Sequence, residues 1–276
     1  MTIPWHQQRL AALDFESSDK IPQTARIVSC ALILVGGGQP TSTREWLLNP
    51  GIPMEPDAIK THGITDEYAA AHGKDAKQGV HEIAQAIAEV VTAGVPLVGH
   101  NLGGYDLNLL NHECIRHLGD TLEGICQQPL TQVIDSMILD WYAAPYRQRV
   151  SPEQGPYEMK TTAQTYGLGW DDDKAHGATY DALMSARAAY KIGSIAHTPR
   201  GQRPEWVQQL RNRRGPYERF DHLAGIDVAE LHRRQAVWAA DRAAGLQEHF
   251  RKTDPTAVVR GEWPLIPAPT DGGVTS

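Results

Sequence analysis

The segment Arg26–Val35 constrains the fold of this 276-residue chain more than any other. Its sequence, RIVSCALILV, is apolar and rich in β-branched residues, a pattern typical of a strand. Three glycines at 36–38 follow it and predict a turn, and Glu45–Leu48 then predicts a returning strand. A β-hairpin is therefore expected near the start of the fold.

Further strands are predicted at Arg9–Glu16, Pro96–His100 and Gln132–Leu139. Apolar residues at helical spacing predict helices between and after them, at Pro56–His62, Asp66–Ala71, Val80–Ala93, Asp106–Leu118, Thr161–Tyr166 and Tyr180–Ile195. This order of elements indicates an α/β fold, in which helices pack on a mixed sheet. We expect one domain to cover residues 8–196.

The pattern changes after this domain. Residues 197–262 begin with an arginine-rich segment, which has six arginines between His197 and Phe220, and continue with a long predicted helix at Asp227–Lys252. The arginines either contact a phosphate backbone or pair with acidic groups of the protein itself. The helix has an apolar stripe that must be covered, by the domain, by a second copy or by a partner protein. Residues 263–276 are rich in Pro and Gly and are expected to be disordered.

The charge and the cysteines exclude little and suggest a location. The net charge is −7, with 14 Lys and Arg against 23 Asp and Glu in residues 1–195. An acidic domain can still bind a polyanion when metal ions mask its carboxylates. Three cysteines without a C-x-x-C pair predict neither a disulfide framework nor a zinc ribbon, and His112, Cys114 and His117 do not share one helix face. Because no long apolar run is present, we expect no membrane span and a cytoplasmic protein.

Two acidic residues end the first predicted strand. Asp14 and Glu16 alternate with Phe15, so both carboxylates project from one face and Phe15 from the other. Two like charges side by side are costly unless a cation lies between them, which favours a metal site. A solvated strand end before a turn explains the same residues equally well.

Two further segments add acids and one histidine. Asp106 follows two glycines at the predicted start of a helix, where it is either a helix cap or a metal ligand. His176 and Asp181 stand in H-G-A-T-Y-D at another predicted helix start. They are either a solvent-exposed histidine and a first-turn acid or a general base beside a bound metal.

Taken together, the four carboxylates and the histidine indicate a function more specifically than any one of them alone. Four carboxylates from three segments and one histidine meet the needs of a two-metal phosphodiester hydrolase, in which two cations about 3.5–4 Å apart activate water and stabilise the leaving oxygen. Carboxylate oxygens are ligands typical of Mg²⁺ or Mn²⁺.

At these residues the chain resembles the DEDDh (DnaQ-like) 3′–5′ exonuclease family, which includes the proofreading subunit of bacterial DNA polymerase III. The first motif matches at 14–16, the second at 101–106 and the third at His176 and Asp181. His62-Gly63-Ile64 resembles the family's H-G-I segment, which helps to hold the 3′-terminal nucleotide. The resemblance covers roughly residues 8–196.

The resemblance implies a ribonuclease-H-like sheet of five strands with the hairpin strand antiparallel, and it assigns roles. Asp14, Glu16, Asp106 and Asp181 would bind the metal ions and His176 would be the base; the substrate-binding residues would be Ser17, His62, Ile64, Asn101 and Tyr105. Two departures stand out, since Ser17 replaces a common Thr and the second motif has one extra residue between Asn101 and Asp106.

Three functions are compatible with these residues. The leading hypothesis is hydrolysis of single-stranded DNA from its 3′ end, with release of nucleoside monophosphates. The second is an exoribonuclease acting on short RNA, because recognition of the 2′-OH decides between DNA and RNA and no residue reveals it. The third is a non-catalytic nucleic-acid-binding module on the same fold.

Overall fold

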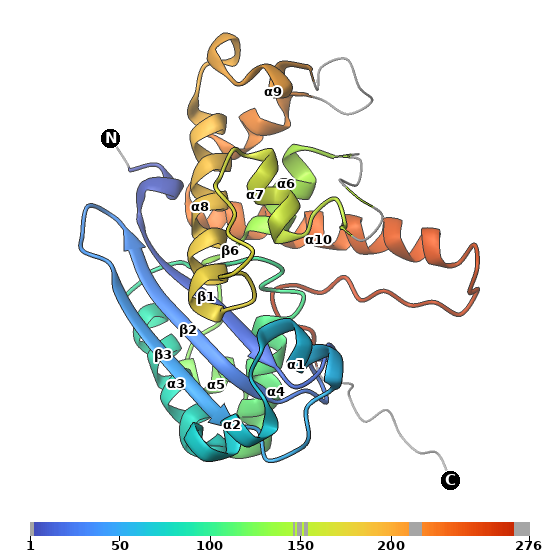
Figure 1. Ribbon diagram of the computed structural model, residues 1–276. Coiled ribbons are helices and arrows are strands. Elements are labelled where there is room, and N and C mark those ends of the chain that lie inside the picture. Colours follow the sequence, from blue (N-terminus) through green and yellow to red (C-terminus); the bar gives the residue numbers. More distant parts are fainter. Residues whose placement is uncertain (1–2, 146, 148–150, 152–153, 210–216, 268–276) are drawn as a thin grey trace.

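The computed structural model describes residues 3–145, 147, 151, 154–209 and 217–267. Six strands form one sheet in the order β4-β3-β2-β1-β5-β6. Figure 1 shows β1, β2 and β3 side by side in this sheet. Strand β2 runs antiparallel to its neighbours β1 and β3, and the other pairs of neighbours are parallel. The predicted α/β fold with its antiparallel hairpin strand is confirmed.

The strands are β1 (Arg9–Ser17), β2 (Ile27–Gly36), β3 (Ser42–Asn49), β4 (Lys74–Asp75), β5 (Leu97–Gly99) and β6 (Val133–Asp135). All five predicted strands are present, and the two-residue β4 adds a sixth. The hairpin turn depends on Gly36, which has a φ of +76° and whose Cβ, if present, would lie 2.7 Å from the Gln8 carbonyl oxygen.

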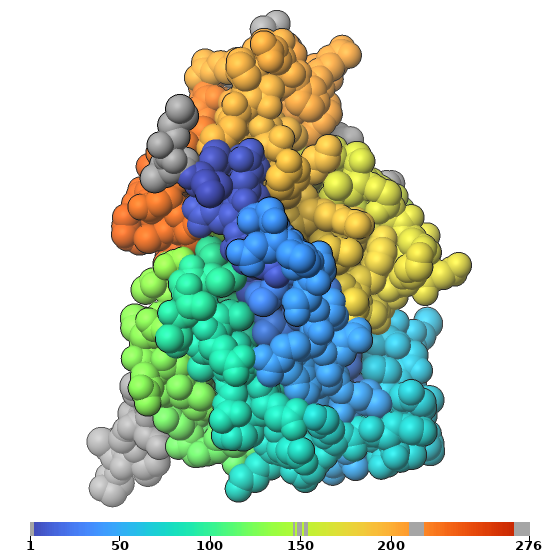
Figure 2. Space-filling model, turned by 90° about the vertical axis from the view of Figure 1, so that its left-hand side faces the viewer, coloured from blue at the N-terminus to red at the C-terminus, as the bar shows by residue number. Residues whose placement is uncertain are grey.

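Helices cover both faces of the sheet. One face carries α3 (Ala76–Thr92), α4 (Asp106–Leu118) and α5 (Leu122–Cys126), and the other carries α6 (Ser136–Ala143), α7 (Met159–Thr165), α8 (Ala178–His197) and α10 (Val228–Phe250). The remaining elements are α1 (Pro56–His62), α2 (Asp66–His72), α9 (Glu205–Gln209) and the short 3-10 helices η1 (Trp5–Gln7), η2 (Arg200–Gln202) and η4 (Tyr217–Leu223). Figure 2 shows the blue hairpin strands between the green helices of one layer and the gold residues of α8.

Residues of β1 alternate between the two halves of the core. Leu10 and Ala12 pack with α8, whereas Leu13 and Phe15 pack with α3 and α4. This alternation is the period of a strand whose two faces are both covered. It directs Asp14 towards the α8 side, the side from which Asp181 comes.

The predicted strand Gln132–Leu139 is wrong beyond its first half. Only Val133–Asp135 is a strand, and residues 136–143 form α6. The Asp135 carboxylate accepts hydrogen bonds from the main-chain N–H groups of Met137 and Ile138, so it caps the helix. A short apolar run fits a buried strand and a buried helix equally well, and the cap decides the outcome here.

The long C-terminal helix α10 docks on the sheet. Gln235 of this helix is fully buried, accepts from the Asp135 main-chain N–H at 2.7 Å and donates to the Val133 carbonyl oxygen at 2.9 Å. Trp238 stacks on Tyr142 with ring centroids 3.7 Å apart. The helix thereby covers the edge strand β6, whose main-chain groups would otherwise lack partners. None of the helices in the described ranges is long and apolar enough to cross a bilayer.

Residues 263–267, expected to be disordered, lie against the domain instead. After α10 the chain returns towards α4 (Figure 1), where the Ile266 main-chain N–H donates to Asn108 at 2.7 Å. Trp263 covers Gly103, where a Cβ would lie 2.0 Å from the indole nitrogen. Residues 268–276 of the same predicted segment lie outside the described residues.

The arginine-rich segment is partly structural. Arg203 is 4% exposed and donates to the carbonyl oxygens of Ile195, Ala196 and Thr198, which caps the end of α8. It also pairs with Asp221 at 2.5 Å. For this arginine the protein itself supplies the anionic partner; Arg211, Arg213 and Arg214 lie outside the described residues.

Candidate active site

Three carboxylates meet where β1 ends. One oxygen each of Asp14, Glu16 and Asp181 lies within 4.8 Å of the other two. Asp14 and Glu16 share a face of β1, as predicted, and Asp181 comes from the first turn of α8. Within the described part of the chain no other group of histidine, cysteine and acidic side chains is arranged to hold a metal.

Burial and mutual repulsion both oppose the ionisation of the clustered carboxyl groups. Burial raises the pKa of Asp14 well above its usual range, and the charges of Asp106, Glu16 and Asp181 raise it further. Burial, followed by the charges of Asp181 and Asp106, raises the pKa of Glu16 to about 8. Clustered acids of this kind fit a divalent cation, because its charge would remove the repulsion.

His176 and Asp181 are joined through the main chain. The His176 N–H donates to Asp181 Oδ2 at 3.1 Å, and Asp181 Oδ1 is buried without a hydrogen-bond partner among the described residues. An unpartnered carboxylate oxygen at this place suits a metal ligand. His176 has a φ of +63°, an unusual conformation for a residue other than glycine, and its side chain is exposed at the rim of the cluster.

Asp106 is the first residue of α4, after the N-cap position Tyr105, and is buried beside the cluster. Its Oδ1 accepts the Phe15 main-chain N–H at 3.2 Å, which ties the start of α4 to the end of β1. It lies outside the group of three acids within 4.8 Å, although its charge raises the pKa of Asp14 and Glu16, after burial in each case. Asp106 thus belongs to the same charged centre, one step removed from the other three.

Asp135 fixes the loop that contains the second motif. Its two oxygens accept the main-chain N–H groups of Asn101 at 2.9 Å and Gly103 at 3.1 Å. Asn101 takes a left-handed conformation with a φ of +61°. The extra residue of this motif is therefore accommodated in a tightly held turn, and Asp106 still reaches β1.

A first cleft of about 690 Å³ opens beside Glu16. Four of the five predicted substrate-binding residues line it: Ser17, His62, Asn101 and Tyr105. Ser17 Oγ lies 2.5 Å from the Tyr105 hydroxyl oxygen, and the two side chains form one hydrogen-bonded edge of the cleft.

Ile64 does not line this cleft. It packs instead beside Val28, Met54 and Ala69 in a small apolar cluster under α1 and α2. Its neighbour His62 reaches the cleft, and burial lowers the pKa of that imidazole. The H-G-I segment therefore contributes its histidine to the cleft and uses its isoleucine for packing.

A second cleft of about 1120 Å³ is lined by His176 and Asp181, and Asn101 lines both clefts. The sequence did not single out its residues Tyr157, Trp170 and Arg242, because no motif marks them and α10 lies beyond the resemblance. Only their position in the folded chain brings them to the site.

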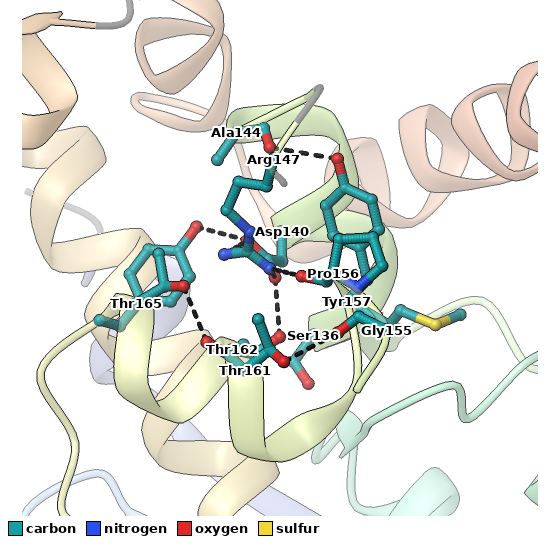
Figure 3. A network of polar contacts seen from close by, with 12 residues as sticks. Ser136, Asp140, Ala144, Arg147, Gly155, Pro156, Tyr157, Thr161, Thr162 and Thr165 are labelled. Carbon is teal, nitrogen blue, oxygen red and sulfur yellow. Dashed lines mark hydrogen bonds and ion pairs between the residues drawn. The ribbon is translucent and has the colours of Figure 1, made fainter. Parts of the chain in front are cut away.

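A buried polar network holds one wall of the second cleft (Figure 3). Arg147 donates to both oxygens of the fully buried Asp140, and Thr162 Oγ1 donates to Asp140 Oδ2 at 2.7 Å. Burial raises the pKa of Asp140, and the Arg147 guanidinium opposes that rise. From the same segment the Tyr157 carbonyl oxygen accepts from His100 Nε2 at 2.9 Å, so the loop is attached to the second motif as well.

A ribonuclease-H-like sheet with clustered carboxylates at the end of its central strand and a histidine at their rim defines a class, the metal-dependent nucleases. The comparison with protein families specifies which. A family model described as Exonuclease matches residues 11–189, and the chain belongs to this family. The predicted exonuclease is confirmed at this level.

The solved structures that the chain resembles share the fold. E. coli Exonuclease I in complex with a dT13 oligonucleotide is 17% identical, with a TM-score of 0.55 over 75% of this chain and 44% of that one. Exonuclease I from Methylocaldum szegediense is 18% identical, with a TM-score of 0.53 over 74% and 43%. A zinc-bound form of the E. coli Exonuclease I–ssDNA complex is 18% identical, with a TM-score of 0.53 over 75% and 44%. This chain thus aligns with less than half of each of these proteins.

Proposed function

We propose that the protein is a 3′–5′ exonuclease that hydrolyses single-stranded DNA and releases nucleoside monophosphates. The observation that carries the proposal is the convergence of Asp14, Glu16 and Asp181 within 4.8 Å, with His176 on the adjoining loop. A protein without catalytic activity has no physical reason to keep mutually repelling carboxylates in a partly buried place. The non-catalytic hypothesis is therefore the weaker one.

The residues would divide the work as follows. Asp14, Glu16 and Asp181, with Asp106 beside them, would hold two divalent cations, Mg²⁺ or Mn²⁺. Such ions, when bound, supply an activated water and stabilise charge on the leaving oxygen. His176, exposed to solvent at the rim, would accept the proton of the attacking water. Ser17, His62, Asn101 and Tyr105 would position the terminal nucleotide in the first cleft.

DNA is favoured over RNA by the relatives. E. coli Exonuclease I has been solved with a dT13 oligonucleotide, and this chain shares its fold. An exoribonuclease remains the second candidate, although no described contact favours it.

A cytoplasmic location stays a prediction, supported by three buried, unpaired cysteines, which are typical of a reducing compartment. Self-association or a protein partner at the C-terminal helix also stays a prediction.

The test uses 5′-labelled single-stranded DNA and RNA of one sequence, with Mg²⁺ or Mn²⁺. We expect a ladder of products shortened from the 3′ end of the DNA. An oligonucleotide whose 3′ end carries a blocking phosphate should be shortened very little. A faster reaction on RNA would select the second candidate. Internal cuts, or no cuts with either polymer, would exclude an exonuclease.

His176 is tested separately. Replacement by Ala should lower kcat roughly 10²–10⁴-fold, the range that a positioned general base contributes. His72→Ala is the matched control, because His72 is an exposed histidine that stacks on Tyr68 in α2. Equal rates for the two variants would show that His176 is not the base.

A further inference from the structure

The second cleft is walled by an element outside the matched family residues. Its lining includes His176 and Asp181 of the site together with Arg242, Gly245, Leu246 and Phe250 of α10. The family model ends at residue 189, and α10 begins at Val228. Figure 1 shows that the C-terminal half of α10 extends past α6 and α7. The C-terminal extension therefore adds a surface to the catalytic cluster.

This wall is firmly attached. Gln235 is hydrogen-bonded to both main-chain partners on β6, and Leu231 is fully buried. Trp238 stacks on Tyr142 one turn before Arg242. Arg242 is thus presented from a helix whose position is set by the sheet edge.

The charges of the two clefts differ. The first is lined by the carboxylates of Glu16, Asp19, Glu55 and Asp57 and by a single lysine, Lys20. Such a lining suits the end of a strand more than its phosphates, because a polyanion would be repelled. The second is lined by the cations Arg242 and Lys160 and by the acids Glu158, Asp172 and Asp181, so its cations and acids are more nearly balanced, with Lys160 paired to Asp172 at 2.7 Å.

Arg242 is the unusual cation of the second cleft. It has neither an ion pair nor a hydrogen bond with any other described residue, although it is partly buried. Burial lowers its pKa, and the nearby Asp135 and Tyr157 partly oppose this. A partly buried guanidinium with no carboxylate in hydrogen-bond contact is costly, and it suits a phosphodiester, which it can bind through two parallel hydrogen bonds.

Aromatic side chains accompany it. Trp141, Tyr157 and Trp170 line the cleft, as does Phe250, which is 46% exposed. Rings beside a cation are the usual means of holding a single strand without regard to sequence, since every base can stack.

We propose that the second cleft holds the single strand on the 5′ side of the scissile bond, with Arg242 contacting a backbone phosphate. The inference rests on the proposed function, because it places the cut end at the acidic cluster and the rest of the strand along α10. The C-terminal extension is then a strand-gripping element rather than a structural cover alone.

Gly245 offers a direct test. It lies on α10 in the lining of the cleft, and an added Cβ would meet no atom within 4 Å. We expect Gly245→Lys to tighten, and Gly245→Glu to weaken, the binding of a 5′-labelled oligothymidylate, with Gly245→Gln between them. Val237 is the matched control position, because it is 60% exposed on the same helix and outside the cleft. The same charges at Val237 should leave the affinity unchanged.

Arg242→Ala provides a second measurement. Affinity should fall roughly tenfold or more, the size of a lost hydrogen bond to a charged group. The slope of log K against log salt should become shallower by about 0.7, the value for one phosphate contact on a single strand. Arg242→Lys should restore part of both. Binding is measured in EDTA, so that the strand is not cut, and circular dichroism checks that each variant is folded.

The outcomes separate the two claims. The role of the second cleft would be overturned if charges at Gly245 and Val237 changed the affinity for the oligothymidylate equally. It would also be overturned if Arg242→Ala left the slope of log K against log salt unchanged. Charge-dependent binding in EDTA without any hydrolysis after Mg²⁺ or Mn²⁺ is added would support the cleft and exclude the proposed exonuclease.

Discussion

The acidic side chains of the site lower the stability of the folded state when they are charged, because they lie close together and are removed from water. Glu16 has its pKa raised to about 8 by burial and then by the charges of Asp181 and Asp106. A carboxyl group with a raised folded-state pKa binds its proton more tightly in the folded than in the unfolded chain. Stability is therefore lost as pH rises from the unfolded value of 4.5 towards 8. The charged carboxylates of the site repel one another, and a bound cation would reduce this repulsion.

The metal-free protein should accordingly lose thermal stability between about pH 5 and pH 8, measured as Tm in EDTA. Mg²⁺ at pH 8 should restore it, because a ligand that binds only the folded chain stabilises that chain. Glu16→Gln should flatten the pH dependence and reduce the shift with Mg²⁺. Glu89→Gln is the control, since Glu89 is 67% exposed and far from the cluster in a surface ion pair. A pH dependence identical in Glu16→Gln and the wild type would contradict this account.

The convergence of the acidic residues could be predicted from the sequence, whereas several contacts around them could not. Asp14, Glu16 and Asp181 converge as expected because strand alternation and the first turn of a helix fix their directions locally. The bond from the Phe15 N–H to Asp106 could not be predicted, because it depends on how β1 and α4 cross in space. Arg242 carries no motif, and it reaches the site only through the docking of α10.

At the scale of elements, a buried carboxylate of α6 links Arg147 to α7 through charge and hydrogen bonds. Asp140 is fully buried and is satisfied by Arg147, Thr162 and Tyr166, whose hydroxyl lies 2.9 Å away. This segment carries Tyr157 to the wall of the second cleft. A buried carboxylate with one charged partner is strongly destabilising once that partner is removed.

Arg147→Ala should therefore cost about 3–5 kcal/mol of unfolding free energy, measured by denaturant titration. Arg260→Ala breaks an exposed pair with Glu262 and should cost about 0–1 kcal/mol. If both variants lost the same small amount, Asp140 would not depend on Arg147 for its charge, and the network would have to be assigned a different role.

Some element boundaries were predictable from the sequence, whereas α3 begins four residues before its predicted start at Val80 and α8 extends two residues beyond each predicted end. The helices Pro56–His62 and Asp106–Leu118 have the predicted bounds, and the hairpin lies where the glycines indicate. The failure at Gln132–Leu139 has a local cause, since Asp135 ends a strand and caps a helix at once. The helix α5 is one short turn-like element of five residues, too short for apolar spacing to reveal.

For the whole molecule, the C-terminal extension completes the domain. The fold from β1 to α8 leaves β6 as an edge strand, and α10 satisfies two of its main-chain groups through Gln235. The sequence identified the helix and its apolar stripe. It could not decide between docking, self-association and a partner, because a stripe does not specify what covers it.

Gln235→Ala should destabilise the protein by about 1–3 kcal/mol, because a buried N–H and a buried carbonyl oxygen would lose their partner. Gln85→Ala, at an exposed position of α3, should change stability by less than about 0.5 kcal/mol. Thermal unfolding followed by circular dichroism compares the two. A wild-type Tm for Gln235→Ala would mean that water replaces the glutamine and that the docking of α10 does not depend on it.

The central claim is that the clustered acids cut nucleic acid from a 3′ end with the help of divalent cations. The most direct measurement is the initial rate of nucleoside monophosphate release from single-stranded DNA, in EDTA and after Mg²⁺ is added back, for the wild type and for Asp14→Asn. We predict release only with Mg²⁺ and only by the wild type. Release in EDTA, or equal release by Asp14→Asn, would contradict the account.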